Sequence, residues 1–187
     1  MGGTESRFAL RALKSREDLF DIFILPTAWG KTGWVWEESE FRQWIDEKIT
    51  LTQVLIQRKQ LHIDLSLQVT IPNEFEKIAN INVGITAGIE TTKVAPAWIE
   101  KSNEMDKIIV VSEHAKYGFE NTKYPLQNQL GEHVADLSFD KPIEVVGYPV
   151  REFEPADIDI DFETEFNFLA VALWGPRKNM EKTILNF

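Results

Sequence analysis

The sequence contains no cysteine among its 187 residues. Disulfides, thiolate metal ligands and cysteine nucleophiles are therefore excluded. No stretch approaches the roughly 20 apolar residues that a membrane-spanning helix needs. No apolar signal segment follows the polar N-terminus. We therefore expect a cytoplasmic protein without a transmembrane segment.

Basic residues are scarce relative to acidic ones. The chain has 20 Lys and Arg against 30 Asp and Glu, which gives a net charge of −10. A general nucleic-acid or anionic-membrane surface needs an excess of positive charge, so no nucleic-acid partner is expected. The three histidines, His62, His114 and His133, are too scattered to suggest a metal site, and no metal or cofactor is expected.

Two strand–loop–helix units stand in the middle of the chain. An apolar strand is predicted over residues 81–85, and Pro96 suits the first turn of a helix over 97–105. A second strand follows over 107–111, and Ser112 is placed to cap a helix over 113–121. Successive units of this kind predict parallel strands joined by crossover helices.

Ligands of open parallel sheets bind at the carboxyl ends of the strands. In this chain those ends are Thr86–Glu90 and Ser112–His114. Gly88 lies in the first of these segments, and its backbone can approach a ligand closely because glycine has no side chain. We take Thr86, Gly88, Glu90 and Ser112 as candidate substrate-binding residues, with Glu90 and Thr86 directed at hydroxyl groups.

Residues 88–119 resemble the inner part of the N-terminal domain of GT-B glycosyltransferases of the group 1 or family 4 type. The resemblance rests on a Glu-Thr pair followed by Pro-x-Trp, and on Met-Asp before an apolar strand and a serine. Residues 2–7 resemble the family's glycine-rich loop, and residues 168–180 resemble the first strand and loop of its second domain.

The resemblance implies an α/β fold, a Rossmann-like parallel sheet flanked by helices. It implies an acceptor-side domain over 1–150, an acidic linker over 151–165, and the start of a nucleotide-sugar-binding domain over 166–187. The implied activity is metal-independent, retaining transfer of a sugar from a nucleotide-sugar donor to a glycan or lipid-linked acceptor. The chain would then be a fragment, inactive alone, with surface for self-association and for peripheral membrane contact. The alternative is a non-catalytic sugar- or partner-binding module.

The resemblance also suggests roles for residues outside the central units. Lys178 matches a lysine that holds the donor diphosphate, and Arg177 could replace an arginine whose usual position reads Ala172-Leu173. These two cations are the expected catalytic residues. Gly2 and Gly3 would offer backbone N–H groups to a phosphate or acceptor at a helix N-terminus.

Two motifs each have two possible interpretations. Trp29, in a loop with two further tryptophans, could stack on a sugar ring, although packing is the default for such side chains. The alternating aspartates of 157–161 are similar to the metal-binding D-x-D of another glycosyltransferase fold. An acidic linker explains them better, because no buried strand precedes them.

The remaining pattern predicts elements along the rest of the chain. They are a helix over 5–14 capped by Thr4, a strand over 19–25, helices over 40–47 and 51–58, a half-exposed edge strand over 61–70, a long loop over 124–137, strands over 143–146 and 166–173, and a helix over 179–187.

Overall fold

A computed structural model describes residues 2–27, 38–150, 152–157, 159–172 and 174–186. The chain is mixed α/β and contains a four-stranded parallel sheet flanked by helices. It divides into two compact units, Met1–Val150 and Arg151–Phe187. The first unit holds the sheet and is built around its own core.

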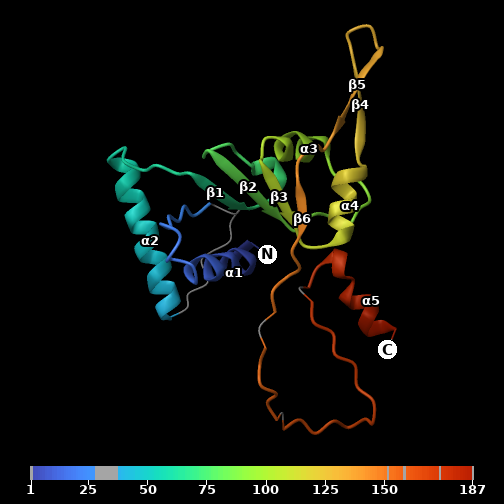
Figure 1. The fold of residues 1–187 in the computed structure, drawn as a ribbon. Coiled ribbons are helices and arrows are strands. Elements are labelled where there is room, and N and C mark those ends of the chain that lie inside the picture. The colour runs from blue at the N-terminus through green and yellow to red at the C-terminus, as the bar shows by residue number, and fades with distance from the viewer. Residues whose placement is uncertain (1, 28–37, 151, 158, 173, 187) are drawn as a thin grey trace. The chain divides into compact units, whose positions relative to one another are not determined.

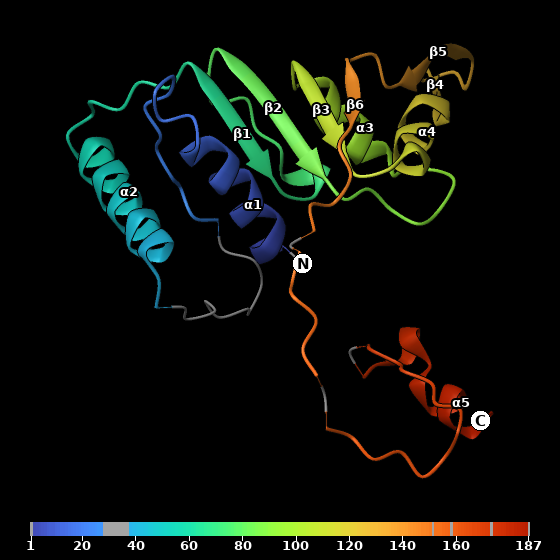
Figure 2. The same cartoon turned by 60° about the horizontal axis from the view of Figure 1, so that its bottom comes forward.

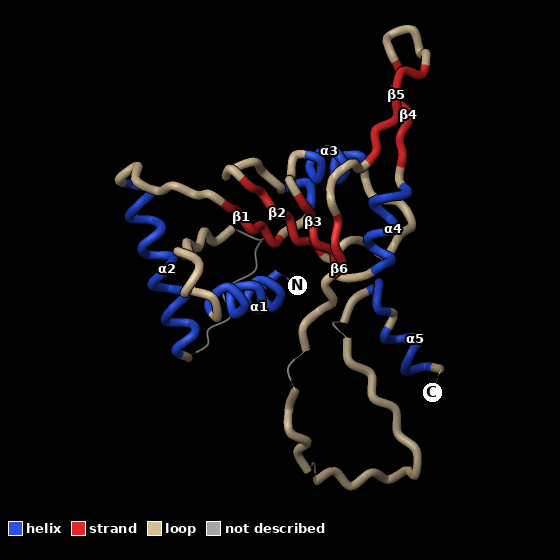
Figure 3. Tube along the Cα trace, viewed as in Figure 1, coloured by secondary structure: helices blue, strands red, loops and turns tan. Residues whose placement is uncertain are grey.

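The elements follow one another as labelled in Figure 1, and Figure 3 separates helices from strands by colour. They are α1 (Gly2–Lys14), α2 (Glu40–Gln57), β1 (Leu65–Val69), η1 (Pro72–Glu74), β2 (Ile81–Thr86), α3 (Pro96–Asn103), β3 (Lys107–Val110), α4 (Glu113–Asn121), β4 (Lys123–Gln127), β5 (His133–Ser138), β6 (Ile143–Val145), η2 (Pro176–Lys178) and α5 (Met180–Leu185).

The sheet has the strand order β1-β2-β3-β6, and all three pairings are parallel. The two central strand–loop–helix units are thus confirmed, with Pro96 in the first turn of α3 and Ser112 as the N-cap of α4. The order of the strands across the sheet is therefore the same as their order along the chain. Right-handed crossovers then bring successive connections to the same face. In agreement, α3 and α4 both pack against the core that contains Ile108 and Val110.

The main core lies between that face of the sheet and these helices. Its buried members are Phe75, Val94, Ile99, Met105, Ile108, Val110, Ala115 and Phe119. The Phe119 ring meets Phe139 edge-on at a centroid separation of 5.6 Å and stacks on Trp98 at 6.3 Å. This core fixes α4 against the sheet and therefore positions the loops at the strand ends.

A second, smaller core joins α1 and α2. It consists of Ile22, Ile24, Phe41, Trp44 and Ile45. The predicted strand over 19–25 is wrong, although Ile22 and Ile24 are buried in alternation as a strand would require. The Ile24 N–H donates to the Thr52 hydroxyl at 2.9 Å, so it bonds to a helix side chain instead of a neighbouring strand. Figure 2 shows α1 lying beneath β1, which it contacts.

Two further elements differ in length from their predictions. A single helix, α2, replaces the two helices expected over 40–47 and 51–58. Its threonines are tolerated because the Thr50 and Thr52 hydroxyls donate to carbonyls four residues earlier. The edge strand β1 is confirmed but shorter than 61–70, because its partner β2 begins opposite Leu65.

Residues 124–137 are not a loop but most of an antiparallel hairpin of β4 and β5. Asn128 closes the turn by accepting from the Leu130 and Glu132 N–H groups, and Gly131 takes a φ of +81°. Figure 1 shows the hairpin extending beyond the sheet. The sequence pattern did not predict β4 because it contains Pro125, and proline within sheets is found mainly in edge strands.

The second unit carries no strand among its described residues. The prediction of a strand over 166–173 is therefore wrong for 166–172, and Leu173 lies outside the described residues. An isolated strand cannot pair its backbone groups, so an apolar run without a neighbouring strand gains nothing from the extended ladder. The helix expected over 179–187 is shorter, Met180–Leu185.

None of the described helices combines the length and the apolar character needed to cross a bilayer.

Candidate functional site

The candidate site lies at the carboxyl ends of β2 and β3, in the first unit. Thr86 ends β2 beside Val110, its neighbour in register at the end of β3. Thr86 is buried, and its hydroxyl accepts from the Gly88 N–H at 3.4 Å. The hydroxyl therefore holds the first turn of the loop, which makes Thr86 a supporting group for that backbone.

At Gly88 the loop after β2 comes very close to α4 (Glu113–Asn121). Its φ is +75°, a left-handed conformation that side chains other than glycine rarely adopt. A Cβ atom at this position would lie 2.6 Å from the Cβ of Ala115, in the first turn of α4. The loop after β2 is thus pressed against the helix that follows β3. The segments that follow the two strand ends therefore lie against each other.

The first turn of α4 contributes two further polar groups. The Ser112 hydroxyl caps the helix by accepting from the Ala115 N–H at 3.1 Å. His114 Nε2 lies 3.2 Å from the backbone carbonyl of Glu90, so as a donor it ties the far end of the loop to α4. Glu90 itself is exposed. Thr86, Gly88, Glu90 and Ser112 are therefore brought to one edge, as expected from a parallel sheet.

Arg177 and Lys178 lie in the second unit, in the turn η2, and both side chains are exposed. Pro176 begins this turn, and Asn179 ends it in the left-handed region with a φ of 51° before α5 starts. Two adjacent cations thus precede the first turn of a short helix. No buried residue surrounds them among the described residues of 152–186.

Gly2 and Gly3 do not form a loop before the first helix. Both belong to α1, which starts at Gly2, so Thr4 is not the N-cap that the sequence predicted. No proline interrupts residues 2–14, and the helix extends back to the N-terminal glycines. Their N–H groups remain in the first turn, where a helix has no internal acceptors. Trp29 and the two other tryptophans of its loop lie outside the described residues.

No three His, Asp or Glu side chains are gathered as a metal-binding group within the described parts of the chain. His133 pairs with Asp136 in the hairpin at 2.8 Å, and His62 lies 3.3 Å from Asp64. Asp157, Asp159 and Asp161 are exposed and belong to a segment without helix or strand.

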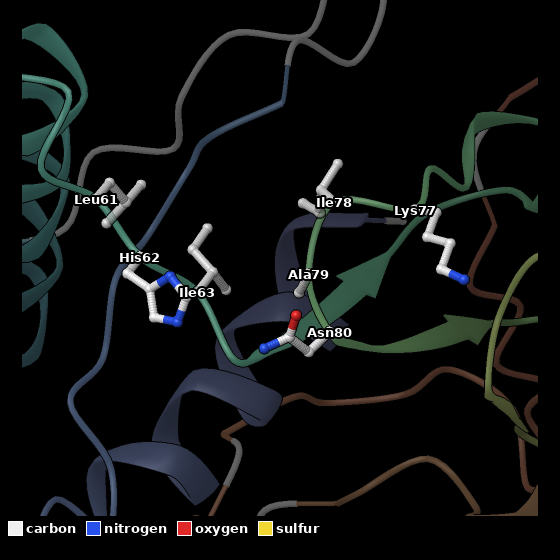
Figure 4. Close-up of a pocket in the computed structure, with 7 residues that line it drawn as sticks. All are labelled: Leu61, His62, Ile63, Lys77, Ile78, Ala79 and Asn80. Atoms are coloured by element: carbon white, nitrogen blue, oxygen red, sulfur yellow. The ribbon is translucent and has the colours of Figure 1, made fainter.

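A shallow depression lies at the opposite, amino end of β1 and β2 (Figure 4). Residues 61–63 and 77–80 line it. Two of the lining residues are held by buried Asn82, whose side-chain carbonyl accepts from the Ile78 and Ala79 N–H groups at 2.9 and 3.0 Å. These polar groups already satisfy one another, and the depression is on the side of the sheet where parallel α/β proteins seldom bind ligands.

The sequence pattern missed the two residues that join the strand ends, His114 and Ala115. Comparison with protein-family models, curated proteins and solved structures found no match for this chain. The fold and the geometry of the strand ends therefore carry the functional argument.

Proposed function

We propose that the chain belongs to a retaining, metal-independent glycosyltransferase of the GT-B type, which transfers a sugar from a nucleotide-sugar donor to a glycan or lipid-linked acceptor. The first unit binds the acceptor. The residues in contact with acceptor or sugar hydroxyls are Glu90, by its carboxylate, and Gly88 and Ser112, by the backbone around them. Thr86 and His114 hold this loop in place.

One observation carries the proposal. The loop of residues 86–90 is locked against the first turn of α4 by the Gly88–Ala115 contact and by the bond between His114 and the Glu90 carbonyl. These contacts support a site that would be formed before ligand binds, at the edge of a parallel sheet where small ligands bind. Hydroxyl-rich ligands suit an exposed carboxylate on a fixed backbone, because a carboxylate accepts two hydroxyl donors at once.

The donor side of the proposal rests on the second unit. Negative charge develops on the nucleoside diphosphate as it leaves, and nearby cations and backbone N–H groups stabilise that charge. Lys178 and Arg177 stand just before α5 and are assigned to this role, and the exposed η2 turn leaves them accessible to an anion. In the first unit, Gly2 and Gly3 at the N-terminus of α1 are assigned separately to backbone donation to a phosphate or an acceptor hydroxyl.

The test uses the complete transferase to which the chain is proposed to belong, because the chain alone is expected to be inactive. It measures release of nucleoside diphosphate from a panel of nucleotide sugars, with and without oligosaccharide acceptors. Acceptor-dependent release is expected, and it should fall by roughly 10²–10³ in Lys178→Ala, the effect of losing one transition-state donor. Glu90→Gln should raise the acceptor KM, whereas Glu100→Gln, an exposed carboxylate on α3, should not. Release that is independent of Lys178, or an acceptor KM unaffected by Glu90, would contradict the assignment.

A non-catalytic sugar- or partner-binding module is the second candidate, and it is favoured because no buried residue surrounds Arg177 and Lys178 among the described residues of 152–186. The two candidates separate in one experiment. Acceptor sugars would perturb the amide resonances of residues 86–90 and 112–114 in both cases. Only a transferase would also bind a nucleotide sugar with a dependence on Lys178.

A further inference from the structure

The second unit carries an exposed apolar run, residues 166–172. Phe166, Phe168, Leu169 and Val171 are all exposed, with Leu169 at 90% and Val171 at 87% of their full surface. Such a contiguous patch is rare on a protein surface unless a partner covers it. Near-continuous apolar character is also typical of a strand buried on both faces.

Residues 166–172 form neither helix nor strand, but two of their aromatic side chains lie together. The Phe166 and Phe168 rings meet edge-on at a centroid separation of 5.0 Å, as expected for alternate residues on one side. Asn167 is the only polar residue of the run. Its side chain exchanges hydrogen bonds with Thr164, at 2.8 Å to the hydroxyl and 3.0 Å to the carbonyl. The Asn167 side chain therefore already has one donor and one acceptor partner within its own chain.

The charges on either side of the run are opposite. Residues 152–165 include seven Asp and Glu and no Lys or Arg. The residues after the run include Arg177, Lys178 and Lys182, with a single acid at Glu181. If two copies paired in parallel, acidic segment would face acidic segment. If they paired antiparallel, each acidic segment would face the basic turn of the other copy.

A two-fold axis at Leu169 also matches side-chain sizes. It places Phe166 opposite Ala172, and Phe168 opposite Ala170, so that each large ring faces a small residue of the other copy. Asp161 then lies opposite Arg177. Directly opposed side chains are the unit of stabilisation in antiparallel pairs, and large with small fills the face without overpacking. The exposed Ile184 and Leu185 of α5 offer further apolar cover, which a two-stranded ribbon needs.

We propose that residues 166–172 are a homodimerisation strand, which pairs antiparallel with the same segment of a second copy of this chain. The proposal does not rest on the function given above, although both involve the same two cations. The two meet at Arg177 and Lys178, where the partner's acidic segment and an anionic donor would compete.

Sedimentation across a concentration series should show a monomer–dimer equilibrium. Leu169→Lys places two like charges opposite each other on the axis and should raise the dissociation constant by about tenfold or more. Leu130→Lys, at an equally exposed leucine in the hairpin turn, is the matched control and should not change it. A chain that stays monomeric, or a dimer indifferent to Leu169→Lys, would overturn the proposal.

The absence of native cysteine allows the direction of pairing to be read by oxidation. Leu169→Cys should form a disulfide-linked dimer, because the axis brings the two thiols together. Ala172→Cys should not, since its two copies would be about 20 Å apart at 3.3 Å per residue. Mixed Phe166→Cys and Ala172→Cys chains should cross-link to each other. Equal cross-linking of Leu169→Cys and Ala172→Cys as single variants would indicate parallel pairing and contradict the proposal.

A charge exchange tests the contribution of the flanking segments. Arg177→Glu with Lys178→Glu should weaken self-association, and so should Asp159→Lys with Asp161→Lys. An equimolar mixture of the two double variants restores opposite charges at both ends of the ribbon, and it should dimerise as the native chain does. Failure of the mixture to recover would show that charge does not set the orientation.

Discussion

Gly88 and Ala115 lie so close together that a side chain at position 88 would collide with Ala115. The ideal Cβ of residue 88 would lie 2.6 Å from the Ala115 Cβ, although 26 residues separate the two in sequence. The contact joins the end of β2 to the start of α4. It makes the backbone of the candidate site depend on two small side chains.

Gly88→Ala should destabilise the first unit by about 2–4 kcal/mol, because it adds both backbone strain and overpacking. Gly131→Ala is the matched control, since Gly131 has a similar φ of +81° but no atom within 4 Å of its missing Cβ. It should show the strain alone, about 1 kcal/mol. Urea unfolding monitored by circular dichroism measures both. Equal losses in the two variants would mean that the Ala115 contact contributes nothing.

A second close approach lies beneath the middle of β2. A Cβ on Gly84 would lie 2.5 Å from the Phe75 ring, which is fully buried. Gly84→Ala should therefore cost about 1–3 kcal/mol by overpacking. Phe75→Leu makes room at that point, so the double variant should be less destabilised than the sum of the single changes. Additive losses would show that the ring can move aside without cost.

Residues at the strand ends could be located from the sequence because two simple patterns coincide there. The apolar run of β2 followed by Ala87-Gly88, and the run of β3 followed by Ser112, set both strand ends and the cap of α4. Parallel pairing then brings them to one edge. The close contact with Ala115 could not be predicted in this way, because alanine in a helix carries no pattern of its own.

The errors of prediction share a cause. Ile22 and Ile24 alternate as in a strand, but the side chain of Thr52 takes the backbone donor that a strand neighbour would need. Residues 166–172 are apolar as in a buried strand, yet their described surroundings supply no partner. Periodicity reports which side chains can be buried, whereas a strand also requires a neighbouring chain to receive its hydrogen bonds.

Asn82 organises the amino ends of β1 and β2. Its fully buried side-chain carbonyl accepts from two backbone N–H groups and from the Ser66 hydroxyl, and its amide donates to the Ala79 carbonyl at 2.8 Å. Asn82→Ala leaves these groups without partners and should cost about 2–4 kcal/mol. Asn80→Ala, an exposed change in the same loop, should be nearly neutral. Amide exchange at Ile78 and Ala79 should rise only in the first variant, and unchanged protection there would contradict this account.

Glu17 lies in the turn that follows α1 and links this turn to α2. Its carboxylate accepts from Trp44 Nε1 at 2.9 Å and lies 3.1 Å from Lys48 Nζ. The hydrogen bond from Trp44, followed by that from Lys48, lowers the pKa of Glu17 below its ordinary value of 4.5. A carboxyl whose folded pKa is depressed binds its proton more weakly in the folded chain than in the unfolded one. Its stabilising effect is therefore complete above pH 4.5 and is lost as the pH falls through the folded pKa.

Glu17→Gln should accordingly flatten the acid side of the stability profile. The glutamine carbonyl can still accept from Trp44, so the indole keeps a partner while the titrating charge and the Lys48 ion pair are removed. Urea midpoints from about pH 6 to about pH 3 should fall less steeply in this variant than in the native chain. Glu100→Gln removes an exposed carboxylate of α3 and serves as the control, with the native slope expected. If both variants keep the native slope, Glu17 does not couple protonation to the packing of α1 on α2.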